Sequence, residues 1–185
     1  MSYTELIHSI LDEIDRTLSA LNAEKVEMLA DEIIKAENVF LVGVGRVLLS
    51  LKSFTKRLNH LGIKAYYVGE INEPAFKKTD LLIVTSRSGK TLFPLSVAQK
   101  AKLLGGKIVY IGSAITGFLP ESADLNLSIP SYGINTNDLQ YFSNQIMSSL
   151  FEQSILLLGD VICLQILDKK GLKPDDVCKF HANLE

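Results

Sequence analysis

DLLIVTSRSGKT, residues 80–91, passes within one short stretch from an uninterrupted apolar run into a polar loop that contains glycine. Residues 81–84 are all apolar, which is typical of a strand covered on both faces. A helical pattern follows at residues 91–104. A buried strand, a loop and a helix in succession predict one unit of an α/β fold built on a parallel sheet.

The same succession of strand, loop and helix recurs along the chain. Strands are predicted at residues 38–43, 64–69, 80–86, 107–113 and 124–130. Helices are predicted between them at residues 47–61, 91–104 and 117–122. Repetition of this kind predicts an α/β domain with a parallel sheet and right-handed crossovers.

Two further helical patterns precede the first strand, at residues 4–19 and 23–36. In the first of them an apolar residue recurs every three or four positions, which predicts an amphipathic helix. This stripe comprises Leu6, Ile7, Ile10, Leu11, Ile14 and Leu18. The pattern leaves Glu13, Asp15 and Arg16 on the solvent side.

The C-terminal part begins with a polar stretch, SYGINTNDL at residues 131–139, which is predicted to be a loop. A long helix is predicted at residues 140–169, ended by Lys169, Lys170 and Gly171. It is apolar on almost all sides, whereas the core of one domain covers a single stripe of a helix. We therefore expect part of its surface to meet another subunit in a homo-oligomer.

The composition is that of one folded domain. The chain has 185 residues, of which 47% are hydrophobic and 22% charged, and a net charge of -2. This charge gives no broad attraction to nucleic acid or to acidic membranes. The N-terminal stretch lacks the basic region of a signal peptide, and the apolar segment at residues 154–167 is too short to span a bilayer and contains Asp160. These features predict a cytoplasmic protein.

Two cysteines, Cys163 and Cys178, have no neighbouring His or Cys in the sequence. Their spacing matches no zinc-binding pattern, and two cysteines do not indicate a disulfide scaffold. Both are predicted to be reduced, buried thiols.

Two loops qualify as ligand sites, because ligands of parallel sheets bind beyond the carboxyl ends of the strands. The first is GVGRV at residues 43–47, where glycines permit close approach and Arg46 adds a positive charge. A dinucleotide site is an alternative, although Leu48 stands where the third glycine of that motif is required. Glu70, after the next strand, could serve as the ribose-binding acid of such a site and keeps this alternative open. A plain turn with a solvated arginine is a further alternative for this loop.

The second loop, at residues 86–91, ends in Gly-Lys-Thr like a nucleoside triphosphate loop. That motif requires a glycine where Val84 stands, inside the strand, which argues against a triphosphate. Ser86, Ser88 and Thr91 instead supply hydroxyl groups beside a helix N-terminus, a combination that suits a single phosphate. The alternative is that Ser88 or Thr91 simply caps the helix.

Few residues are candidates for acid–base chemistry. Glu152 lies on a mostly apolar helix, where it is either a general base or a surface acid. His8 and His60 are predicted to be structural or solvated. His181 stands in the C-terminal tail, where packing does not explain a histidine.

Several segments together are recognisable: GVGR, RLNHLG, YYVGE followed by Pro74, SRSGKT, SLFEQ, DKKGL and the terminal HANLE. The chain resembles the SIS (sugar isomerase) domain family over essentially its whole length, and within it the 6-phospho-3-hexuloisomerase branch. The resemblance implies a single domain over residues 1–185, folded as a three-layer sandwich whose five-stranded parallel sheet has a flavodoxin-like order. It also implies a homotetramer with sites near subunit interfaces, the helices of residues 4–36 and the segment 140–185 being in subunit contacts.

By the same resemblance, the reaction interconverts 3-hexulose 6-phosphate and fructose 6-phosphate through an enediol(ate), without metal or other cofactor, in the ribulose monophosphate route of formaldehyde assimilation. The residues implied to bind the phosphosugar are Gly45, Arg46, Val47, Ser86, Arg87, Ser88, Gly89, Lys90 and Thr91. Glu152 is implied as the proton acceptor. His181 is a candidate for contact with the opened sugar or for proton transfer.

The chain departs from the family pattern at several of these positions. Val47 and Leu48 replace the usual Ser and Gly after GxGR, and Lys90 replaces the usual Glu of the phosphate loop. Before the long helix, the usual Gln-Pro-Met-Gly is QIMS at residues 145–148. These departures keep two alternatives open, another phosphosugar isomerase of the family and a non-catalytic phosphosugar-binding protein.

Overall fold

The structure, a computed structural model, describes residues 1–130, 143–181, 183 and 184. Its helices are α1 (Tyr3–Ser19), α2 (Ala23–Lys35), α3 (Gly45–His60), α4 (Leu92–Leu103), α5 (Phe118–Ser122), α6 (Ser149–Lys169) and α7 (Pro174–Cys178). Its strands are β1 (Val39–Val42), β2 (Ala65–Tyr67), β3 (Leu81–Thr85), β4 (Lys107–Gly112) and β5 (Leu125–Ser128). Each predicted strand is confirmed to within two residues at either end.

In the part of the chain that the structure describes, the strands form one parallel sheet in the order β2-β1-β3-β4-β5. Val39 of β1 pairs with Ala65 of β2 on one side and with Leu81 of β3 on the other. This is the predicted flavodoxin-like order, and the direction of winding changes between β1 and β3. The carboxyl ends of these two strands therefore mark the expected place for a ligand.

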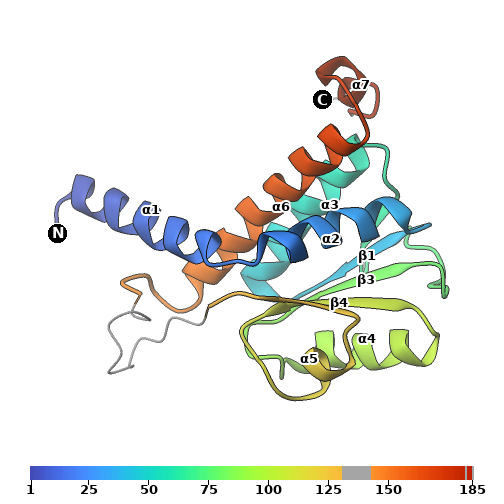
Figure 1. Cartoon of the computed structure of the whole chain (residues 1–185), viewed down its shortest axis with the longest axis horizontal. Coiled ribbons are helices and arrows are strands. Elements are labelled where there is room, and N and C mark those ends of the chain that lie inside the picture. Colours follow the sequence, from blue (N-terminus) through green and yellow to red (C-terminus); the bar gives the residue numbers. More distant parts are fainter. Residues whose placement is uncertain (131–142, 182, 185) are drawn as a thin grey trace.

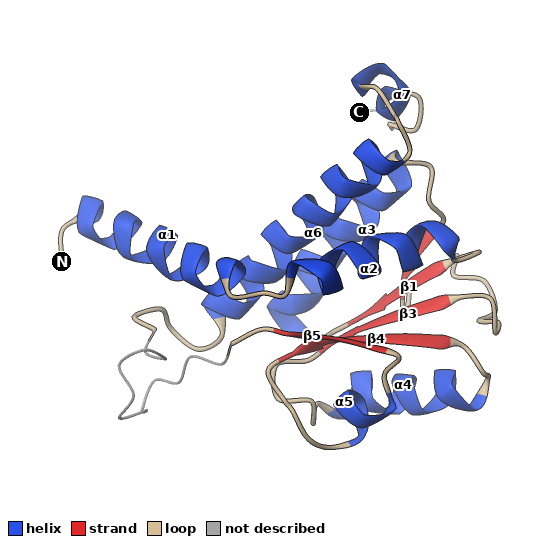
Figure 2. Cartoon of the chain, viewed as in Figure 1, coloured by secondary structure: helices blue, strands red, loops and turns tan. Residues whose placement is uncertain are grey.

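Alternate residues of each central strand point into two separate cores. Leu41 and Ile83 pack in the core on one face of the sheet, whereas Phe40 and Leu82 pack in the core on the other. Helices α2, α3 and α6 cover the first face, and α4 and α5 cover the second, as Figures 1 and 2 show. Burial on both faces explains why the strands are uninterrupted apolar runs.

Helix α1 differs from its prediction in which side chains it buries. Its N-terminal half projects away from the sheet (Figure 1), so that three of the six residues of its apolar stripe are exposed, namely Leu6, Ile7 and Leu11. Glu13, predicted on the solvent side, is buried with only 2% of its surface exposed. Amphipathic periodicity identifies the helix but not which face the tertiary structure covers.

The helix predicted at residues 140–169 begins later, at Ser149. Residues 143–148 form a non-helical segment, while the loop predicted at 131–139 and the predicted helix start at 140–142 lie outside the described residues. Residues 143–145 of this segment donate hydrogen bonds to Glu13 of α1. By length and composition α6 could cross a membrane, but half of its most apolar window is buried in the fold, as in a core helix.

The two cysteines are free thiols in different surroundings. Cys163 is buried in α6, as predicted, but Cys178 is exposed on α7, so the prediction that both are buried is wrong for Cys178. The short α7 was not predicted. It follows Gly171 and turns the chain back toward the end of α3.

Candidate active site

The loops that follow β1 and β3 lie side by side at the carboxyl edge of the sheet. A Cβ placed on Gly43, after β1, would lie 3.5 Å from the carbonyl oxygen of Thr85 at the end of β3. The GVGRV loop and the loop of residues 86–91 are thus neighbours, as expected at the point where the winding direction changes.

The loop of residues 86–91 closes on itself through hydroxyl groups. Ser86, which is buried, donates its hydroxyl to Oγ1 of Thr91 at 3.0 Å, and the Lys90 amide donates to Oγ of Ser88 at 3.3 Å. Gly89 has a φ of 67°, in the left-handed region that favours glycine. Arg87, Ser88 and Lys90 are exposed around this turn, so that two cations and a hydroxyl surround a backbone bend.

Tyr110 of β4 supports this loop from beneath. Its buried hydroxyl donates to the carbonyl oxygen of Ser86 at 2.8 Å and accepts from the Ala114 amide at 3.3 Å. Burial raises the pKa of the Tyr110 hydroxyl, which therefore remains a protonated donor at neutral pH. The Ser113 amide also donates to the carbonyl oxygen of Arg87 at 2.9 Å. The loop backbone is fixed by the sheet and not by its own side chains alone.

The helices that start at this edge have open N-termini. Val44 caps α3 and Thr91 caps α4, neither of them with a side-chain hydrogen bond to the helix, and neither helix has an acid in its first turn. The interpretation that Thr91 or Ser88 serves only to cap α4 is thus not supported. Free amide donors and the positive ends of helix dipoles favour an anion in front of both helices.

Arg46, in the first turn of α3, forms an ion pair with Glu152 in the first turn of α6. Ser50 of α3 also donates its hydroxyl to the Glu152 carbonyl oxygen at 2.9 Å. The pair borders a cavity of about 260 Å³, whose rim includes Leu49 and Leu156. Glu152 is mostly buried, with 13% of its side chain exposed, and is held where the two helices begin.

A second, smaller cavity joins the loop of residues 86–91 to the start of α6. Arg87 lines it together with Met147 and Ser148. Ser148 accepts the Glu152 amide at 3.0 Å, so the residues around Arg87 are one helical turn from the candidate base. The predicted phosphate loop, Arg46 and Glu152 thus come together around the same edge of the sheet.

The other predicted binding residues lie in the loop after β1. Gly45, with a φ of 59°, forms the turn into α3. The side chain of Val47 packs against the core, and its backbone amide belongs to the first turn of α3. Val47 can therefore contribute a backbone donor, but not the hydroxyl that serine would supply.

His181 is not brought to this site within one chain. Its ring stacks on His60, with ring centroids 4.9 Å apart, at the opposite end of α3. Since α3 rises about 1.5 Å per residue, His60 lies about 21 Å from Arg46 along the helix axis. His60 is buried, in agreement with its predicted structural role, whereas His8 is exposed on α1.

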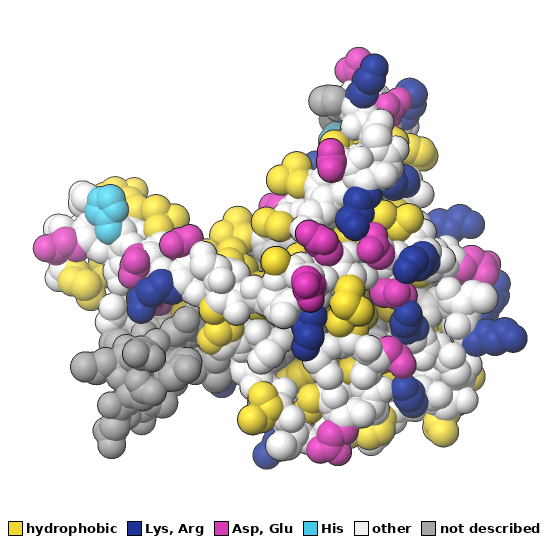
Figure 3. Space-filling model, in the orientation of Figure 1, with side chains coloured by type: hydrophobic (Ala, Val, Ile, Leu, Met, Phe, Trp, Pro, Cys, Tyr) yellow, Lys and Arg dark blue, Asp and Glu magenta, His cyan; other side chains and the backbone are white. Residues whose placement is uncertain are grey.

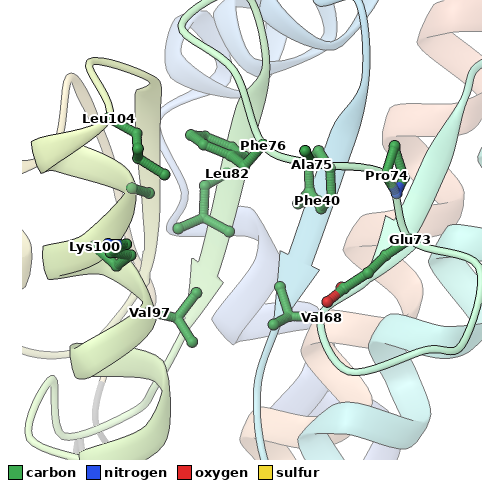
Figure 4. A pocket seen from close by; sticks show the side chains of 11 residues that line it. Phe40, Val68, Glu73, Pro74, Ala75, Phe76, Leu82, Val97, Lys100 and Leu104 are labelled. Carbon is green, nitrogen blue, oxygen red and sulfur yellow. The ribbon is translucent and has the colours of Figure 1, made fainter.

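A separate hollow of about 320 Å³ lies on the α4 face of the sheet, between α4 and the segment that leads into β3 (Figure 4). Its walls are mostly apolar and include Phe40, Phe76 and Val97. The Glu73 carboxylate at its edge accepts from the Gly69 amide at 3.0 Å. The groups suited to a phosphate gather at the strand ends instead.

Sequence comparison identifies the fold family, because the family model for the SIS domain matches residues 32–157. The chain belongs to the SIS domain family. As an SIS domain it is 36% identical, over the full length of both chains, to a Bacillus subtilis protein named 3-hexulose-6-phosphate isomerase. A Methanocaldococcus jannaschii protein of the same name is 36% identical over 86% of this SIS domain and 84% of its own length.

A solved structure agrees with this assignment. The crystal structure of a Methanococcus jannaschii protein, from which a 3-hexulose-6-phosphate isomerase function was inferred, has a TM-score of 0.80 and 33% identity to this SIS domain. The match covers 98% of this chain and 99% of that one. The predicted SIS fold is confirmed.

Three residues around this SIS site were not singled out as site residues from the sequence. Tyr110 lies in a strand that reads as entirely buried, Ser50 in an ordinary helix, and Glu13 on the presumed solvent face of α1. The polar Tyr110 hydroxyl in an apolar strand is a usable signal, since a buried tyrosine usually hydrogen-bonds. Nothing local to Ser50 or Glu13 indicates their partners.

Proposed function

We propose that the protein is a sugar phosphate isomerase that interconverts 3-hexulose 6-phosphate and fructose 6-phosphate. The observation that carries the proposal is the placement of Glu152, paired with Arg46, beside a loop of hydroxyls and cations suited to a phosphate. The names of its relatives support the choice of substrate. The same proposal places the protein in the cytoplasm, in formaldehyde assimilation by the ribulose monophosphate route.

The chemistry requires a base and a group that stabilises negative charge. The carbonyl group moves from C3 to C2 when a base removes the proton on C2 and returns it to C3, while the hydroxyl proton on O2 is transferred to O3 of the enediol(ate). Glu152 is proposed as this base, and the Arg46 guanidinium as the partner of the enediolate oxygen. General acid–base catalysis contributes about 10²–10⁴-fold.

The phosphate group is proposed to be held by the loop of residues 86–91. Backbone amides of the loop and of the start of α4, with the Ser88 hydroxyl, donate to its oxygens, and Arg87 and Lys90 add positive charge. Gly45 and Val47 contribute backbone donors from the start of α3. Binding at the phosphate, remote from C2 and C3, orients the reacting carbons.

We further propose that the working form is a homo-oligomer, by resemblance a tetramer, in which His181 reaches the site of another copy. Exposed apolar side chains on α6 support it, including Leu157, Val161 and Leu164. Helix α1 also exposes apolar side chains, including Leu6 and Leu11, and Figure 3 shows hydrophobic atoms on both helices. Several large apolar side chains exposed on two helices are typical of a surface that another copy covers.

The assay for the proposal supplies enzymatically formed 3-hexulose 6-phosphate and follows fructose 6-phosphate with a coupled reaction. Turnover is expected, with deuterium incorporated at C3 of the product in D₂O because the proton passes through the base. Absence of turnover by the wild type would exclude the isomerase, whereas equal turnover by the wild type and a Glu152→Gln variant would exclude Glu152 as its base.

A non-catalytic phosphosugar-binding protein is the second candidate, favoured by the apolar Val47 where the family commonly has serine. Calorimetry with fructose 6-phosphate separates the two candidates. Binding that Ser88→Ala weakens, without any turnover by the wild type, would support the second.

A further inference from the structure

The buried carboxylate of Glu13 connects α1 to the segment that precedes α6. Its two oxygens accept from the Ser143 hydroxyl at 2.7 Å, the Asn144 amide at 2.8 Å and the Gln145 side-chain amide at 3.1 Å. Among the described residues, no Lys, Arg or His lies within ion-pair distance of it. A carboxylate buried in this way depends on these donors.

The segment that Glu13 holds is folded tightly. The Ser143 hydroxyl, besides donating to Glu13, accepts from the Gln145 amide at 3.1 Å. Two residues later Met147 has a φ of 53°, in the left-handed region that a side chain rarely adopts. Such a conformation persists only where the surrounding structure imposes it. The hydrogen bonds to Glu13 hold the start of this segment, at residues 143–145, in place.

This segment forms one wall of the candidate site. Ser143, Met147 and Ser148 line the small cavity that also contains Arg87 of the phosphate loop. Ser148 then accepts the amide of Glu152, the candidate base. The hydrogen bonds of Glu13 thus lead, through one short segment, to both the phosphate loop and the base.

We infer that Glu13 is a positioning residue of the phosphosugar site. It fixes residues 143–148 in the shape that places Ser148 in the cavity lined by Arg87, and thereby positions the first turn of α6, which carries Glu152. The hydrogen bonds that the described residues make to the Glu13 carboxylate come from residues 143–145 and not from the phosphate loop or Glu152. The inference rests on the proposed function, because it assigns Glu13 to the same site.

Glu13→Gln tests the inference, since it keeps the size of the side chain and replaces one acceptor oxygen by a donor that faces other donors. Asp12→Asn is the matched control, because Asp12 is the adjacent acid on the exposed side of α1. The measurements are kcat and KM for 3-hexulose 6-phosphate, Kd for fructose 6-phosphate, thermal unfolding, and hydrogen exchange of the amides of residues 143–149.

At a temperature where both variants are fully folded, Glu13→Gln is expected to lower kcat/KM at least tenfold. It should also raise Kd for fructose 6-phosphate and speed exchange at residues 143–149, leaving the α4 amides unchanged. Asp12→Asn should match the wild type. Ser143→Ala should give a smaller effect of the same kind, and the double variant should be no worse than Glu13→Gln alone, because the two side chains act through one contact.

A folded Glu13→Gln variant with the kcat/KM of Asp12→Asn would overturn the inference. If Glu13→Gln does not fold, Ser143→Ala tests the positioning role instead. Unchanged Kd, kcat/KM and amide exchange in Ser143→Ala would overturn the inference. A different result would contradict the proposed function: the wild type does not bind fructose 6-phosphate, or Ser88→Ala leaves its Kd unchanged. Normal phosphosugar binding that depends on Ser88 but not on Glu13 or Ser143 would reject the positioning role alone.

Discussion

Arg46 and Glu152 stand 106 positions apart in the chain and form an ion pair where α3 and α6 begin. Arg46 is largely exposed, with 66% of its side chain accessible, whereas Glu152 is 13% accessible. The guanidinium can therefore turn toward an incoming sugar while the carboxylate stays in place. In the proposed reaction, the two groups form an ion pair in the free enzyme. Once the sugar is bound, Glu152 acts as the base and Arg46 stabilises the enediolate oxygen.

Replacing Glu152 by glutamine should lower kcat for 3-hexulose 6-phosphate by about 10²–10⁴-fold, because the amide cannot accept the proton. The affinity for fructose 6-phosphate should change little, since the phosphate loop is untouched. Coupled kinetics and calorimetry measure the two effects.

The matched control is Asp160→Asn, an exposed acid on the same helix. It should retain wild-type kcat. A Glu152→Gln variant as active as Asp160→Asn would reject Glu152 as the base.

Ser88→Ala should weaken phosphosugar binding, because it removes a hydroxyl donor from the phosphate loop. A hydrogen bond to a charged group contributes about 1.5–3 kcal/mol, which corresponds to a rise in Kd of about 10- to 150-fold. Ser96→Ala, an exposed serine on α4, is the control and should bind like the wild type. Equal Kd values for the two variants, measured by calorimetry, would contradict the assignment of the loop.

A mixing experiment tests the proposed contribution of His181 to another copy. Glu152→Gln and His181→Ala are each expected to be nearly inactive alone. Co-refolded in equal amounts, they should recover about a quarter of wild-type activity, because random assembly of a symmetric oligomer restores that share of sites.

The control for the mixing experiment pairs Glu152→Gln with Ser88→Ala, two residues of one chain's site. No site in that mixture is intact, so activity should not rise above that of the separate variants. Absence of recovery in the His181 mixture, with assembly verified by light scattering, would show that the tail does not complete a neighbour's site.

Cys163 should make the protein less stable at alkaline pH. Burial, with a smaller effect of the Asp160 charge, raises the pKa of the Cys163 thiol to about 12, from an ordinary value of 9.0. The unfolded chain therefore releases this proton first, and the stability present below pH 9 is lost as the pH rises toward 12, by up to about 1.4 kcal/mol per pH unit.

Urea unfolding from pH 7 to pH 11 measures this loss for the wild type and for Cys163→Ala. The variant should be less stable at pH 7, because a cavity is left, but its stability should fall less steeply above pH 9. Cys178→Ser should keep the wild-type slope, since Cys178 is exposed. Parallel slopes for wild type and Cys163→Ala would contradict the prediction.

The sequence was sufficient for the fold because its signals are local. Burial on both faces leaves apolar runs such as residues 81–84, and the loop chemistry that follows them marks the strand ends. Because the signals are local, the sequence does not show where contacts between distant residues end a helix, and the start of α6 was therefore predicted too early. Residues 143–148 are kept out of α6 by Glu13, whose partners lie 130 or more positions away and cannot be read from a helical pattern.

The candidate site was predictable in its parts but not in its assembly. The loop of residues 86–91 and Glu152 could be singled out by residue type, but not the Arg46 ion pair or the Tyr110 support, which depend on packing between distant elements. The position of His181 against His60, at the far end of α3, could not be read from the order of residues in the tail.

The exposed thiol of Cys178 is a labelling site from which the position of the tail that carries His181 can be measured. It lies in the same short tail as His181, whose amide donates to the Cys178 carbonyl oxygen at 3.1 Å, and Phe180 between them packs against Gly62. Since the chain's other thiol is buried, a fluorescent dye coupled under native conditions would mark the tail without engineering a cysteine. Energy transfer between dyes on separate copies would then report, in solution, whether each tail rests on its own α3 or crosses to a neighbour.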